Sequence, residues 1–122
     1  MYQQDWIMRE IERMVTAVAK LVFGKKTGEY EIEDVNQYTQ TDQLYLDLVT
    51  LVLQGQINEA ENRLFDALDP ESPQMLSVAL DFYNRLNQFS DEQLELKDFS
   101  REEIQQGLRQ VLKIYGLEGL NA

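Results

Sequence analysis

The chain has 122 residues, 43% of them apolar, and a net charge of −11. This length predicts a single domain, residues 1–122, that is large enough to bury a hydrophobic core. The sequence contains no cysteine and no histidine, which excludes disulfides, thiolate metal sites and nucleophiles or bases made from those side chains. Only carboxylate chemistry, lysine chemistry or a borrowed cofactor remains for catalysis, and we expect no enzymatic activity, no catalytic or metal site and no cofactor.

The negative charge is concentrated in the middle of the sequence. Residues 29–100 hold sixteen acidic and three basic side chains, whereas residues 1–28 hold three acidic and five basic ones. An acidic segment of this kind argues against nucleic-acid binding, which requires clustered lysine and arginine. Solubility is one explanation of the charge, and attraction for a basic peptide or helix is the other.

The start of the sequence gives a prediction about location. It lacks the order of a secretory signal, in which basic residues precede an apolar run. No apolar run approaches the roughly 20 residues that are needed to cross a bilayer. We therefore expect a cytoplasmic protein that does not bind membranes.

Apolar side chains recur at helical spacing along the first half of the chain. They predict a helix from about Gln3 to Phe23 and a short acidic helix from Tyr30 to Gln37. A third helix is expected over Asp42–Gln54, with Thr39 or Thr41 as its N-cap. Apolar residues extend almost around this third helix, which is typical of a helix that is buried or that lacks a partner.

The second half of the chain continues the same pattern. Gly55 provides a turn, Ser72 is placed to cap a helix that begins with Pro73, and Ser100 and Glu103 have the spacing of a capping box. The expected helices cover about residues 57–68, 73–86, 90–97 and 101–115. No stretch alternates long enough to predict a strand, so the predicted fold class is all-α.

Three short segments indicate a degenerate repeat: Gly28-Glu29-Tyr30, Gly55-Gln56-Ile57 and Asn87-Gln88-Phe89. Each places a residue that tolerates left-handed geometry before a polar and then a large apolar residue. Each also follows one apolar helical pattern and precedes another. Stacked hairpins of this kind bury faces that a single hairpin leaves exposed.

The middle hairpin resembles a tetratricopeptide repeat. The resemblance is carried by Leu44, Leu48 and Leu51, the turn at Gly55, and then Ala60, Leu64 and Ala67. It implies a stack of antiparallel helical hairpins with about five to seven helices, a scaffold that binds other chains. The N-terminal sequence, residues 1–11 and 21–30, is also similar to a family of uncharacterised small Gram-positive bacterial proteins. That family shares a tetratricopeptide-like core and has no assigned activity.

In a hairpin of this type the first helix lines a concave groove. The resemblance therefore implies a partner-binding surface formed by Asp42, Tyr45, Val49 and Val52. Its apolar centre and acidic edge suit an amphipathic helix with basic flanks. The alternative is that the first or last helix of the same chain covers this surface. Tyr2 and Trp6, one turn apart, are candidate partner contacts, because aromatic residues concentrate in interfaces, although core packing is their commoner fate.

The predicted function is that of a non-enzymatic protein–protein interaction module or scaffold, whose partner is a protein or peptide. The alternative is an acidic decoy that imitates nucleic acid and inhibits a basic protein, which requires the carboxylates to gather on one exposed face. The apolar surface of the helices predicted over residues 3–23 and 42–54 exceeds the needs of a simple hairpin, so we also predict a homodimer.

Overall fold

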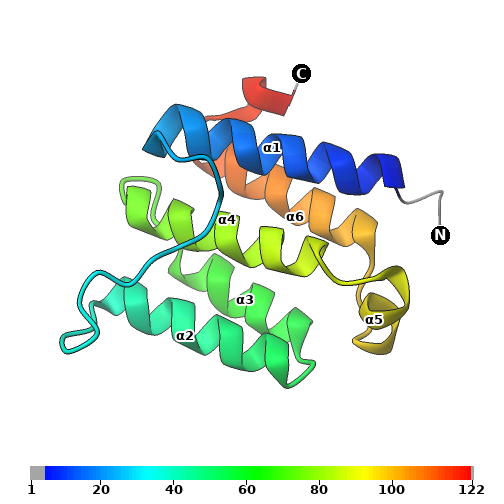
Figure 1. Cartoon of the computed structure of the whole chain (residues 1–122), viewed down its shortest axis with the longest axis horizontal. Coiled ribbons are helices and arrows are strands. Elements are labelled where there is room, and N and C mark those ends of the chain that lie inside the picture. Colours follow the sequence, from blue (N-terminus) through cyan, green and yellow to red (C-terminus); the bar gives the residue numbers. More distant parts are fainter. Residues whose placement is uncertain (1–4, 122) are drawn as a thin grey trace.

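The computed structural model describes residues 5–121, which form six α-helices and the 3-10 helix η2 (Figure 1). The elements are α1 (Asp5–Phe23), α2 (Gln40–Leu53), α3 (Ile57–Ala67), α4 (Pro73–Asn87), α5 (Asp91–Leu96), α6 (Arg101–Ile114) and η2 (Glu118–Asn121). The described residues contain no strand, so the all-α prediction is confirmed.

Local hydrogen bonds set the helix boundaries where the sequence predicts them. The backbone N–H of Asp42 donates to the Thr39 hydroxyl at 3.0 Å, and the Thr39 N–H donates to the Asp42 carboxylate at 2.9 Å, which makes a complete capping box at the start of α2. Ser72, Ser90 and Ser100 each cap the following helix through the side-chain oxygen. The starts of these four helices therefore follow from polar residues beside the apolar pattern.

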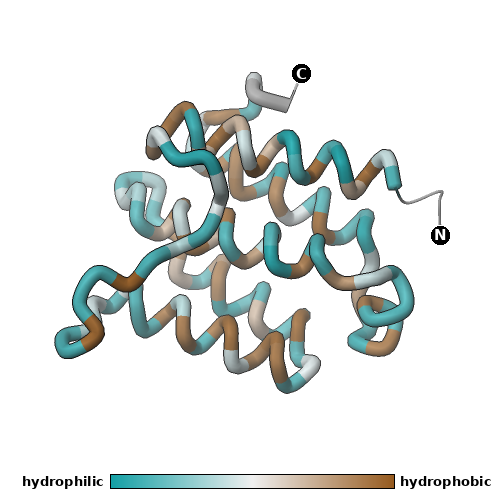
Figure 2. Tube along the Cα trace, viewed as in Figure 1, coloured by the Kyte–Doolittle hydropathy of each residue, from teal (hydrophilic) through white to brown (hydrophobic). Residues whose placement is uncertain are grey.

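Helix α4 lies at the centre of the fold and packs against α1, α2 and α6. Its buried residues extend around most of the helix: Leu76, Val78, Ala79, Leu80, Asp81, Phe82, Tyr83, Leu86 and Asn87. Hydrophobic and hydrophilic residues alternate along the neighbouring helices (Figure 2), and the buried hydrophobic residues of α1, α2, α3 and α6 belong to the same core as those of α4. Helix α2, which the sequence marks as apolar almost all round, lies instead at an edge of the molecule, and Leu53 near its end is 79% exposed.

The prediction of a short helix over residues 30–37 is wrong. Residues 24–39 form a non-helical connection, here called the strap, that crosses in front of α4 from the end of α1 to the start of α2 (Figure 1). A helix there would bring several like charges together on adjacent turns, which is unfavourable. The backbone N–H of Tyr30 instead donates to the Asp81 carboxylate of α4 at 2.9 Å, which holds the strap on the central helix.

Of the three segments that predict a repeat, Gly55-Gln56-Ile57 alone has the expected left-handed geometry at its first residue. Gly55 has φ +78°, in the left-handed region, and turns the chain between α2 and α3. Gly28 is needed for another reason, since a Cβ there would lie 2.4 Å from a methyl carbon of Val15. Asn87 is the last residue of α4 and has no left-handed geometry. Helix α1 packs against α4 and α6, an order that differs from a regular stack of consecutive hairpins.

Candidate protein-binding groove

The surface that the sequence predicts as a groove is closed by α4. Asp42 and Val52 are buried, with 4% and 2% of their area exposed, so neither can line an open groove. Tyr45 and Val49 are half-buried. The space between this face of α2 and the opposing side chains of α4 measures only about 10 Å³. The covering helix is thus α4, rather than the first or last helix that the sequence offers as the alternative.

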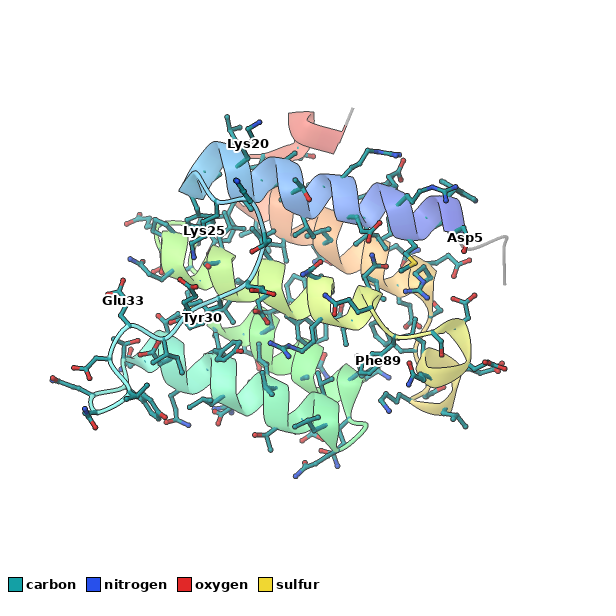
Figure 3. The ribbon with its side chains drawn as sticks, in the orientation of Figure 1. Asp5, Lys20, Lys25, Tyr30, Glu33 and Phe89 are labelled. Atoms are coloured by element: carbon teal, nitrogen blue, oxygen red, sulfur yellow. The ribbon has the colours of Figure 1, made fainter. Side chains whose placement is uncertain are left out.

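Tyr30 of the strap completes the cover over this surface (Figure 3). Its ring centroid lies 5.0 Å from that of Tyr45, and its phenol donates a hydrogen bond to the Asp42 carboxylate. This hydrogen bond, followed by the one from the Thr39 backbone, holds the pKa of Asp42 below its ordinary value. Burial is the main reason that the pKa of Tyr30 is raised. Asp42 therefore serves to fasten the strap and cap α2.

Arg85 of α4 joins the same contact network. Its guanidinium donates to the Tyr45 hydroxyl at 3.0 Å and lies 5.8 Å from the centroid of that ring. It also pairs with Asp81 at 3.1 Å. Burial raises the pKa of Asp81 above its ordinary value, although the Tyr30 N–H and Arg85 both act in the opposite direction. The half-buried Tyr45 is thus held between the strap and α4.

The two aromatic candidates lie away from this surface or outside the described residues. Tyr2 falls among the residues that the structure does not describe. Trp6 is 56% exposed near the start of α1, so its indole is available to a partner. Helix α1 and helix α2 lie at opposite edges of the molecule with α4 between them (Figure 1). Trp6 and the α2 residues therefore do not form one site.

An open groove lies on the opposite side of α2, about half a helical turn from the predicted face. We name it the α2–α3 groove, and its volume is about 890 Å³. Helix α2 contributes Gln40, Gln43, Leu44, Asp47, Thr50 and Leu51. Helix α3 contributes Glu59, Asn62, Arg63, Asp66 and Ala67, and α4 adds Met75 near one end. Both sets recur at spacings of three and four, so the groove follows the length of the hairpin.

The α2–α3 groove combines a partly apolar floor with an acidic rim. Leu51, Ala67 and Met75 are only half-buried although each packs against the core. Asp47 pairs with Arg63 at 2.6 Å, a bridge from α2 to α3. This surface thus offers uncovered apolar area between charged residues, the arrangement that commonly marks a binding site for another chain.

Sequence reasoning misses this groove because apolar periodicity alone does not show which face of an edge helix is covered. The spacing of Leu44 and Leu51 is that of residues in the core of a hairpin, and it gives no sign of an open surface beside them. A usable signal is present on the helix over residues 57–68. Glu59, Arg63 and Asp66 lie on one face of it beside the small Ala67, and such a stripe is typical of a surface that no other helix covers.

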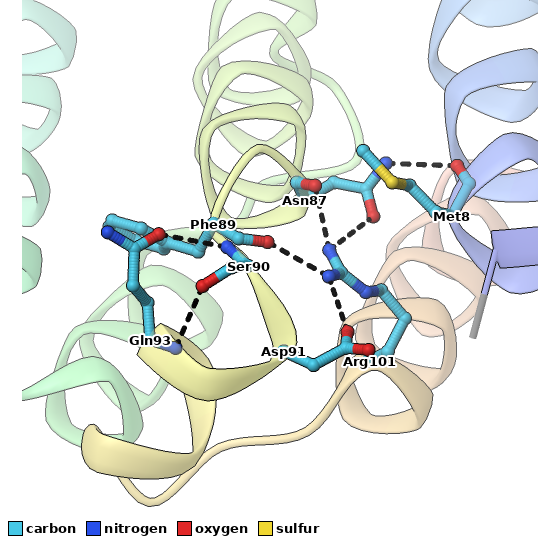
Figure 4. Close-up of polar contacts among 7 residues, drawn as sticks. All are labelled: Met8, Asn87, Phe89, Ser90, Asp91, Gln93 and Arg101. Carbon is cyan, nitrogen blue, oxygen red and sulfur yellow. Dashed lines mark hydrogen bonds and ion pairs between the residues drawn. The ribbon is translucent and has the colours of Figure 1, made fainter. Parts of the chain in front are cut away.

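A second polar centre, at Arg101, joins α1, α4, α5 and α6 (Figure 4). Arg101 is 4% exposed and donates to the backbone carbonyls of Asn87 and Phe89 at 2.7 and 2.9 Å. It also pairs with Asp91 at 2.7 Å, which keeps the pKa of that carboxyl below its usual value. The Asn87 amide donates to the Met8 carbonyl of α1 at 3.0 Å. These contacts fix where four helices meet and leave the guanidinium closed to solvent.

The described part of the chain has neither a cluster of metal-binding side chains nor a membrane-spanning helix. Among residues 5–121, no group of three or more Asp or Glu side chains is arranged to hold a metal ion. Over the same residues, none of the helices has the length and apolar content that crossing a membrane requires.

Over the described residues, α4, the strap and the hairpin of α2 and α3 form an all-helical structure in which the α2–α3 groove is open. Residues 1–116 match a family model described as a family of unknown function, DUF6483, and the chain belongs to this family. No curated protein and no solved structure matches the chain. The predicted resemblance to an uncharacterised family is therefore confirmed at that level, while its tetratricopeptide-like and Gram-positive parts stay predictions.

Proposed function

We propose that this protein is a non-enzymatic interaction module that holds a helix of a partner protein in the α2–α3 groove. The observation that carries the proposal is the groove itself, a hollow of about 890 Å³ lined by both helices of one hairpin. An elongated groove with an apolar floor suits the apolar face of an amphipathic helix, whose contacts recur at the same three- and four-residue spacing.

The packing inside the hairpin supports the tetratricopeptide-like part of this proposal. Ala60 has no exposed area, and its small side chain lets α3 approach α2 closely. Leu48 and Leu64 are also buried within the hairpin. Residues that make a hairpin rigid without covering its outer face leave that face preformed for binding, which lowers the entropic cost of association.

The distribution of the acidic residues gives the decoy alternative less support. Glu31, Glu33 and Asp34 surround a hollow beside the strap, whereas Asp91, Glu92, Glu95, Asp98, Glu102 and Glu103 surround another beside α5. The strap and α5 lie at opposite ends of the molecule (Figure 1). Imitation of nucleic acid would be favoured by one continuous charged face, since the phosphates of a duplex form a regular surface.

A site-specific cross-linking experiment tests the proposal, because the natural chain has no cysteine that would compete for the label. A photo-activated cross-linker is attached to Gln40→Cys, which lines the groove at the start of α2, and, as a matched control, to Gln106→Cys on α6. Both positions are exposed, neutral and helical. After irradiation in cells that express the protein, we expect a partner to be captured from position 40 and not from position 106. Identical captures from both positions, or none from position 40, would contradict the groove.

A further inference from the structure

We infer that the helix bound in the α2–α3 groove is cationic on its flanks, and that Arg63 occupies the place of one of its basic residues in the free protein. This inference rests on the proposed function and names the partner chemistry and the internal competitor of that site. It follows from the positions of four charged side chains: Asp47, Glu59, Arg63 and Asp66.

The carboxylates of the groove are spaced to meet a helix that lies along it. Glu59 and Asp66 are seven residues apart on α3, which places them on the same face about 10 Å apart along the helix axis. Asp47 approaches α3 between them, because it contacts Arg63, and residue 63 lies between residues 59 and 66. A partner helix with lysine or arginine at positions i and i+7, and a third basic residue between them, would meet all three carboxylates.

Arg63 is the single basic residue among the described residues that line the groove. One of its terminal nitrogens lies 2.6 Å from the Asp47 carboxylate, although 56% of the Arg63 side chain is exposed. An exposed ion pair of this kind contributes little stability, so its exchange for another cation requires little free energy. Arg63 is therefore a replaceable occupant, which turns away when a basic residue of the partner reaches Asp47.

Charge complementarity favours a cationic partner helix over an acidic or neutral one. The segment that contains the groove, residues 29–100, carries sixteen acidic and three basic side chains. Like charges across an interface disfavour the wrong partner, and opposite charges both steer the encounter and favour the complex. The apolar floor supplies attraction for any amphipathic helix, and the rim then selects the cationic ones.

Two designed peptides of about 20 residues test the inference by isothermal titration calorimetry with the full chain. Both carry the same leucine face, and they differ in having lysine or glutamate at the three flanking positions. We expect the lysine peptide to bind on the order of ten times more tightly at low salt, with a difference that shrinks as salt is raised. Asn62→Trp, which fills the groove without changing the charge, should abolish its binding.

The displacement of Arg63 has its own matched variants. Arg63→Gln should tighten the lysine peptide about two- to fivefold, because Asp47 is then free to accept the peptide cation. Arg109→Gln is the control, since Arg109 is also half-exposed and also pairs with one carboxylate, Glu10, at 3.1 Å. Arg109→Gln removes the same charge from α6, a helix that contributes no residue to the groove lining.

The outcomes separate the two proposals. Failure of both peptides to bind would overturn the helix-binding groove and this inference with it. The inference that the bound helix is cationic would be overturned if the two peptides bind equally, or if the lysine peptide still binds to the Asn62→Trp variant. In either case the cross-linking experiment still decides whether the groove binds a helix at all. Equal effects of Arg63→Gln and Arg109→Gln would overturn the displacement, because long-range charge alone would then explain the change.

Discussion

Replacement of Arg101 by methionine tests whether the polar centre at the junction of α4, α5 and α6 stabilises the fold. Methionine keeps an unbranched apolar stem and removes the guanidinium. The substitution deletes the hydrogen bonds to the Asn87 and Phe89 carbonyls, a longer one to the Asn87 side chain at 3.2 Å, and the ion pair with Asp91. Because Arg101 is 4% exposed, water does not easily replace the guanidinium at the two carbonyls.

The expected loss in the free energy of unfolding is about 2–4 kcal/mol. Removal of one partner from a fully buried ion pair typically costs about 3–5 kcal/mol. Asp91 keeps 33% of its side-chain area exposed, so water hydrates its charge in the variant and lowers that cost. The unpaired carbonyls add about 1 kcal/mol each, as is usual for hydrogen bonds whose partner is deleted. The Nε atom of Arg101 has no acceptor among the described residues, so the native centre is itself imperfect.

Urea unfolding followed by circular dichroism at 222 nm measures this loss, with Arg109→Met as the control. Arg109 is on the same helix, is 47% exposed and makes one ion pair at 3.1 Å, so its replacement should cost at most about 1 kcal/mol. Two variants that differ by less than about 0.5 kcal/mol would refute the structural role of Arg101. The pKa of Asp91 is depressed in the fold, so its contribution is present at neutral pH and is lost as the pH falls below about 3.8.

Two further predictions concern the contact between α3, α4 and α6. Gly107→Ala should lower the free energy of unfolding by about 1–3 kcal/mol, because its Cβ would lie 2.3 Å from the Tyr83 hydroxyl, whereas glycine-to-alanine changes inside exposed helices usually stabilise. Urea unfolding beside the exposed control Gln106→Ala measures it, and a gain would contradict the packing. Burial raises the pKa of Glu61, so stability should fall as the pH rises above the ordinary value of 4.5. Glu61→Gln should therefore raise the urea midpoint at pH 7 and less so near pH 4.5, and an equal effect at both pH values would refute this.

The helices could be predicted because their signals are local. The start of α2 follows from Thr39, and the start of α4 follows from Ser72 and Pro73, all adjacent to the apolar pattern. The strap could not be predicted in this way. Tyr30 is held by Asp42 and by Asp81, which is 51 residues away in the sequence, so the conformation of residues 24–39 depends on tertiary contacts. Local propensity gives no information on such contacts.

The candidate site could not be predicted for a related reason. Helix α2 carries apolar residues on two faces, and the sequence does not show that α4 covers the face with Tyr45 and Val52 rather than the face with Leu51. The same ambiguity applies to Gly28, whose requirement comes from close approach to Val15. Contacts between helices decide both cases, and those contacts depend on how α4 is placed among its neighbours.

The charge of the groove also bears on the predicted homodimer. A dimer with twofold symmetry places the same surface patch of both copies in contact. A contact from groove to groove would bring Asp47, Glu59 and Asp66 close to the same carboxylates of a second copy, which like-charge repulsion opposes. We therefore expect any homodimer to use another surface, where apolar residues such as Leu53 and Leu96 are 79% and 87% exposed. The acidic rim thus discourages self-association through the groove and leaves it free for a partner of opposite charge.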